Sequence, residues 1–109
     1  MSTRYIRVVA RIDLLPTSVS GRELPIKGGN SYRPNHNFFE PENGNMTVGF
    51  IDLPAGQDLW PAHSVEVPIS FFYWEGLDGQ IYPGRKWRVQ EGARVVGIGT
   101  VLEVLPEQA

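Results

Sequence analysis

The stretch WRVQEGARVVGIGTVLEVL, residues 87–105, decides the fold class of this chain because its pattern predicts two strands joined by a tight turn. Alternate positions after the turn are mostly apolar or β-branched, at Val96, Ile98, Thr100, Leu102 and Val104. This period of two predicts a strand with one packed face. Residues 91–94 supply the turn, in which Gly92 can take a positive φ. Gly97 and Gly99 share the other face, where they indicate a close approach of neighbouring backbone or a sharp coil of the sheet.

The composition is that of a small β-rich protein. The chain has 109 residues, of which 41% are hydrophobic and 20% charged. We therefore expect a single globular domain over residues 1–109, with a short disordered tail from about residue 106. Twelve glycines and nine prolines are spread along the chain. They separate many short elements, as in small barrels and sandwiches.

The rest of the chain predicts further short strands at residues 5–15, 35–39, 46–53 and 64–74, with a short strand or extended arm at 80–84. Residues 16–31 and 54–62 are predicted loops, and 40–45 and 76–79 are predicted turns. Pro68 lies inside an apolar run, which indicates an edge or a bulge. The connections are short, and closure removes exposed sheet edges. The sequence therefore predicts an all-β fold, a six-stranded antiparallel closed β-barrel.

Several function classes are excluded or disfavoured. The chain has no cysteine, so thiolate chemistry is absent, and no phosphate-binding glycine loop or serine nucleophile motif is present. His36 and His63 lie far apart in sequence and are expected to be surface or loop residues, with no metal bound. Glu40 and Glu42 lie in a turn cluster where solvated carboxylates are usual. We therefore expect no enzyme, no cofactor and no nucleotide.

The charge and hydropathy patterns bear on location and partners. The net charge is −2 and the isoelectric point is near 5.6, whereas nucleic-acid binders are usually basic. No run is long enough for a signal peptide or a membrane span. The sequence therefore predicts a cytoplasmic protein with no membrane partner.

Two groups of residues suit binding. Arg7, Arg11, Arg85, Lys86, Arg88 and Arg94 would form one positive stripe if the first and last strands pair. The alternative is a solvated face balanced by Glu91 and Glu103. The aromatic residues Phe72, Trp74, Tyr82 and Trp87, with Phe38, Phe39 and Trp60 elsewhere, are more numerous than a small barrel can bury. They form either an exposed patch for a partner or rings that plug the barrel ends.

The closing stretch resembles the last hairpin of the C-terminal (third) β-barrel domain of elongation factor Tu. That hairpin has an aromatic residue, a turn of Glu-Gly-Gly-Arg type and a Gly-x-Val exit strand, which residues 87–101 follow. Gly21-Arg22-x-x-Pro25 and the later Tyr32-Arg33-Pro34 resemble further motifs of the same domain. The resemblance covers nearly the whole chain and implies a six-stranded barrel that occurs here without the GTPase domain.

The resemblance also implies partners. In the family this domain contributes to binding of aminoacyl-tRNA and contacts other proteins, and Arg22, Arg33, Asn35 and residues 91–94 fall by position in the tRNA-facing region. Glu23 and Glu40 replace a histidine and a basic residue of the family pattern, and Ala93 replaces a glycine. Two such charge changes weaken phosphate binding.

The sequence thus supports two hypotheses. The first is a non-enzymatic module, like a translation-factor C-terminal domain, that binds a protein partner. The alternative is an RNA-binding module for tRNA or another RNA, related to translation elongation. The candidate binding surface comprises Arg22, Arg33, Asn35, Trp74, Tyr82, Arg85, Lys86, Arg88, Glu91 and Arg94.

Overall fold

The computed structural model describes residues 4–29, 32–42 and 44–106. It forms a closed antiparallel barrel with the strand order β1-β4-β3-β2-β5-β6. The strands are β1 (Tyr5–Leu14), β2 (Asn35–Asn37), β3 (Thr47–Ile51), β4 (Ser64–Phe72), β5 (Lys86–Glu91) and β6 (Arg94–Val104). The predicted six-stranded barrel is therefore confirmed.

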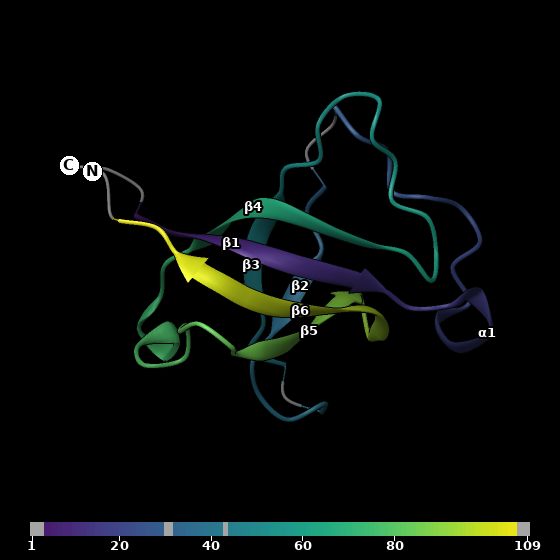
Figure 1. The fold of residues 1–109 in the computed structure, drawn as a ribbon. Helices are drawn as coiled ribbons and strands as arrows, with labels where there is room; N and C mark the ends of the chain where they lie inside the picture. The colour runs from purple at the N-terminus through teal and green to yellow at the C-terminus, as the bar shows by residue number, and fades with distance from the viewer. Residues whose placement is uncertain (1–3, 30–31, 43, 107–109) are drawn as a thin grey trace.

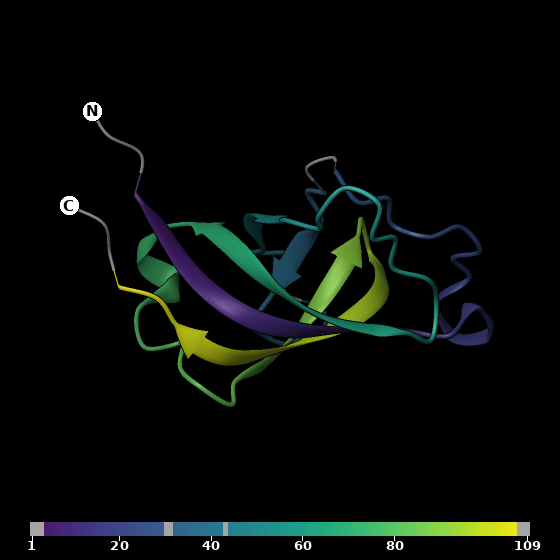
Figure 2. The same cartoon turned by 45° about the horizontal axis from the view of Figure 1, so that its top comes forward.

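Strand β1 lies between β4 and β6 and joins the two ends of the sheet (Figures 1 and 2). Its inward side chains Val8, Ala10, Ile12 and Leu14 are at most 2% exposed. The alternate residues lie toward solvent, as expected of a sheet that packs on one face. The predicted pairing of the first and last strands is present, with Ile12 opposite Gly99.

The inner face of β6 differs from the expected one. Gly97, Gly99 and Val101 are buried, whereas Leu102 and Val104 are 42% and 39% exposed. The reason lies on the neighbouring strand: a Cβ on Gly99 would stand 2.3 Å from the Trp87 ring. The Trp87 indole occupies the barrel interior beside Gly99, where a larger side chain would not fit. The face of β6 that carries the glycines therefore points inward.

The close approach predicted at the two glycines is of two kinds. At Gly97 the neighbour is backbone, because a Cβ there would lie 3.1 Å from the carbonyl oxygen of Asp13. At Gly99 the neighbour is a side chain instead. A register shift between Val89 and Gln90 also brings Val96 into the core. In the turn, Gly92 has φ 62°, as its position predicted.

Other local expectations need correction. The predicted loop 16–31 contains a single turn of helix, α1 (Thr17–Ser20), and the turn at 76–79 begins within a 3-10 helix, η1 (Glu75–Leu77). Residues 80–84 form neither a strand nor a bridge. The last part of the expected tail, residues 107–109, lies outside the described residues.

Pro68 lies in β4, which is an interior strand rather than an edge. Its carbonyl accepts a hydrogen bond from the backbone N–H of Asp52 at 3.2 Å, so its missing N–H also faces the β3 side. The β3–β4 pairing ends at the pair Ile51 and Ile69. The proline therefore stands where no ladder donor is required.

Candidate binding surfaces

The Glu91 cluster, consisting of Arg22, Tyr32, Glu91 and Arg94, brings three of the predicted site residues together. The Tyr32 hydroxyl donates to Glu91 Oε2 at 2.7 Å. Arg22 and Arg94 place guanidinium nitrogens 3.6 and 3.3 Å from the two oxygens of the same carboxylate. Arg22 follows α1, and Glu91 and Arg94 flank the β5–β6 turn, so loop and hairpin are joined through one anion.

Partial burial shapes the chemistry of this cluster. Burial, with the adjacent Glu91 carboxylate, raises the pKa of the Tyr32 hydroxyl well above its usual range. The hydroxyl therefore stays protonated and acts as a donor. The Arg22 side chain is only 18% exposed, and its Nε has no hydrogen-bond partner among the described residues. Both arginines face the single Glu91 carboxylate, which balances one of their two positive charges.

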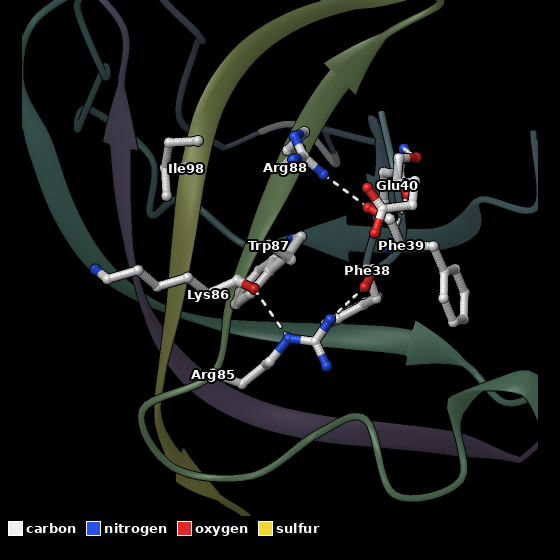
Figure 3. A pocket seen from close by; sticks show the side chains of 9 residues that line it. Phe38, Phe39, Glu40, Arg85, Lys86, Trp87, Arg88 and Ile98 are labelled. Carbon is white, nitrogen blue, oxygen red and sulfur yellow. Dashed lines mark hydrogen bonds between the residues drawn. The ribbon is translucent and has the colours of Figure 1, made fainter. Parts of the chain in front are cut away.

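A second group of predicted residues borders a hollow of about 650 Å³ at the end of β2, shown in Figure 3. Arg85 donates to the carbonyl of Phe38 and to the Gln80 side chain, the latter at 2.7 Å. Arg88 donates to the carbonyl of Phe39 at 2.7 Å. The two guanidinium groups therefore hold the chain as it leaves β2, and each has fewer donors left for a ligand.

The outer stripe of cations is interrupted by internal pairing. Lys86 and Arg11 both lie opposite Thr100 on neighbouring strands. Lys86 donates to the Thr100 hydroxyl at 3.1 Å, and Arg11 pairs with Asp13 at 2.9 Å. Of the predicted stripe, Arg11 and Lys86 thus lie in one row across the barrel, and the carboxylates that pair with its members are Glu91, as predicted, and Asp13 in place of Glu103.

The remaining predicted residues are dispersed. Arg33 lies over the Phe50 ring, 4.7 Å from its centroid. Asn35 lies within β2, between β3 and β5. Trp74 donates from its indole nitrogen to Thr47 at 2.9 Å, whereas Tyr82 is 50% exposed.

The predicted aromatic group divides between core and surface. Trp87 and Phe38 are 3% and 4% exposed and stack with centroids 5.4 Å apart, so these two rings fill the barrel. Phe72 lies on the outside, against Tyr5 at 4.9 Å and Phe50 at 5.3 Å. The aromatic group predicted from the sequence therefore includes two core rings, Trp87 and Phe38, and one surface ring, Phe72.

We call Tyr5, Val48, Phe50 and Phe72 the outer apolar face. It spans β1, β3 and β4, with Tyr5 38% and Val48 47% exposed. Strand alternation does place Tyr5 and Phe72 on outward faces, and that signal could have indicated them. Sequence alone could not show that Phe50 lies beside both, because the strand order 1-4-3 is not sequential.

His36 is not the surface or loop residue that its context predicted. It is fully buried in β2, and its Nδ1 accepts a hydrogen bond from the Trp87 indole at 2.9 Å. Its Nε2 lies against Gly49 without a well-formed hydrogen bond to any described residue. Desolvation lowers the pKa of His36 to about 4, so the ring is neutral at pH 7. No group of three or more His, Asp or Glu side chains suited to a metal ion occurs in the described ranges.

The chain is similar in sequence to part of a known protein. The chain is 34% identical over 98 residues to elongation factor Tu 2 of Streptomyces avermitilis. The aligned part is 90% of this chain but 23% of that protein, so the chain spans less than a quarter of the relative's length.

Two further searches, one for a matching protein family and one, over the described residues, for a membrane-spanning helix, found nothing. No protein-family model matches the chain. Within the described residues, no helix is both long and apolar enough to cross a membrane. Over nine-tenths of its length the chain thus resembles part of elongation factor Tu, and its closed six-stranded barrel is like the C-terminal domain of that factor.

Proposed function

We propose that this barrel is a non-enzymatic binding module, related to a translation-factor domain, that binds a protein partner in the cytoplasm. The outer apolar face carries the proposal. Tyr5, Val48, Phe50 and Phe72 gather on the outside of a barrel whose inside is already filled by Phe71, Trp87 and Phe38. Exposed groups of large apolar and aromatic side chains are typical of protein interfaces.

The internal pairing of the cations favours a protein over RNA. Arg22 and Arg94 share Glu91, and Arg85 and Arg88 donate to backbone carbonyls. A phosphate backbone would have to compete with these partners for the same guanidinium groups. Because RNA affinity depends mainly on cations available to phosphates, the RNA-binding alternative has less support than the protein-binding function.

The test is capture of partners by the folded wild-type chain and by a Phe50→Ser/Phe72→Ser variant, followed by quantitative mass spectrometry. We expect the variant to lose a protein that the wild type enriches, since each serine removes apolar contact area. A Val19→Ser/Leu24→Ser variant is the matched control, because these side chains are 69% and 73% exposed elsewhere. Circular dichroism establishes that all three chains are folded. Identical captured proteins from all three would contradict the proposed function.

A further inference from the structure

The outer apolar face continues into two hollows. One, of about 390 Å³, is lined by Met46, Val48, Phe72 and Trp74 among others; we call it the Trp74 hollow. The second, of about 320 Å³, is lined by Tyr5, Arg7 and Asp78 among others; we call it the Arg7 hollow. Because Val48 and Phe72 belong to the first and Tyr5 to the second, the hollows and the face form one surface across three strands.

Positive charge borders this surface. Arg7 and Phe50 both lie opposite Ser70, on the two sides of β4. The Arg33 guanidinium lies over the Phe50 ring. Neither arginine forms an ion pair with a carboxylate of the described chain. The Glu91 cluster has the opposite arrangement, since there each arginine faces an internal anion.

Carboxylates lie near this surface, but none forms an ion pair with Arg7 or Arg33 in the described part of the chain. Asp78 in the Arg7 hollow accepts a hydrogen bond from the Tyr73 hydroxyl at 2.8 Å. Asp52 directly follows β3, two residues beyond Phe50, and Glu103 lies opposite Val9, two residues from Arg7 on β1. The surface is therefore apolar at its centre and positive at its edges, which complements an apolar segment that carries negative charge.

We propose that the partner presents a short extended segment in which an apolar anchor side chain is followed by acidic residues; this rests on the proposed function. The anchor occupies the Trp74 hollow, and carboxylates pair with Arg7 and Arg33. Guanidinium groups bind carboxylates through paired, charge-assisted hydrogen bonds, which makes arginine well suited to this role.

The strand spacing sets the length of the segment. Strands β3 and β1 flank β4, so they lie about 10 Å apart at the usual spacing of neighbouring strands. An extended chain advances roughly 3.3 Å per residue. The Trp74 hollow meets β3 at Val48, two residues from the row that contains Phe50 and Arg7. The anchor and the carboxylate that reaches Arg7 are therefore about four residues apart in the partner.

The experiment uses fluorescein-labelled peptides of equal length in which leucine and phenylalanine alternate with glutamate, with lysine or with serine. Fluorescence anisotropy should show binding of the glutamate peptide and not of the lysine peptide. An Arg7→Glu/Arg33→Glu variant should bind the glutamate peptide roughly tenfold more weakly. Arg11→Glu is the matched control: Arg11 is exposed on the same strand and already pairs with Asp13, so its loss should change affinity by no more than about twofold.

The outcomes separate the two proposals. Equal binding of all three peptides, or of none, would overturn the acidic-segment inference. The protein-binding function would still stand if the Phe50→Ser/Phe72→Ser variant loses its captured protein. If the arginine variant instead loses binding to tRNA and no peptide binds, the surface recognises RNA and both proposals fail.

Discussion

At the residue scale, His36 shows how a polar side chain is held in an apolar barrel. The Trp87 indole donates to Nδ1, which requires that nitrogen to be unprotonated, so the ring proton is on Nε2. Phe71 packs edge-on against the same ring, with centroids 4.9 Å apart. Protonation of His36 would break the indole hydrogen bond and place a charge in the core.

The burial of His36 predicts a loss of stability in acid. Its pKa in the folded chain is about 4, below the ordinary value of 6.5. The unfolded chain therefore takes up the proton first as the pH falls. The stabilisation is complete above pH 6.5 and is lost as the pH falls toward 4, with a limit of roughly 3 kcal/mol in the free energy of unfolding.

Urea denaturation between pH 7 and 4 measures this effect. His63→Gln, which changes the exposed histidine, should leave the pH dependence as it is. Carboxylates such as Asp13, whose pKa is lowered chiefly by a hydrogen bond from Ser64, act in a lower range, as the pH falls below 4. A free energy of unfolding that stays constant from pH 6.5 to 4.5 would contradict the assignment of a neutral buried His36.

At the element scale, the β5–β6 hairpin is organised by one ring. Trp87 lies opposite Gly99 and covers it, while Phe38, Phe71 and His36 surround the rest of the indole. In this hairpin, β5 therefore contributes the large Trp87 side chain, and β6 makes room for it with Gly99, which has no side chain. The alternation of the apolar residues alone predicts instead that the face with Ile98, Leu102 and Val104 points into the barrel.

This packing predicts that Gly99→Ala destabilises the barrel by about 1–3 kcal/mol, as overpacking of a core does. The added Cβ would lie 2.3 Å from the buried indole, which is itself packed against Phe38, Phe71 and His36. Gly44→Ala is the matched control, because a Cβ there meets nothing within 4 Å. Thermal unfolding of both variants measures the difference, and equal melting temperatures would show that the ring can move.

At the scale of the whole molecule, the barrel is closed and its interior is filled, so a partner would bind to its outer surface. Packed aromatic rings occupy the interior, and the described cations either pair within the chain or border the outer apolar face. The net charge is −2, so no general attraction to a phosphate backbone is expected.

The charge distribution predicts that the chain does not shift tRNA in a gel at about 0.15 M salt, close to physiological ionic strength. The reason is that Arg22 and Arg94 are both engaged by the Glu91 carboxylate, which balances one of their two positive charges. Electrophoretic mobility at increasing salt tests this, with Glu91→Gln as the comparison because it releases both arginines. A wild-type affinity that is tight at low salt and falls steeply with added salt would support the RNA-binding alternative.

Much of the fold of this protein could be predicted from the sequence alone. The alternation in residues 5–15, 64–74 and 87–105, with glycine and proline between them, predicts the strands and the closed barrel. These signals are local, because a strand and a turn depend on neighbours in the chain. The β5–β6 turn with Gly92 was predictable for the same reason.

Only the tertiary structure decided which residues meet. Arg22 and Glu91 are distant in sequence yet share an ion pair, and Phe50 lies beside Tyr5 through the strand order 1-4-3. The inward glycine face of β6 and the burial of His36 both depend on the position of the Trp87 ring. Such contacts result from barrel closure, which sets packing between strands that no local pattern specifies.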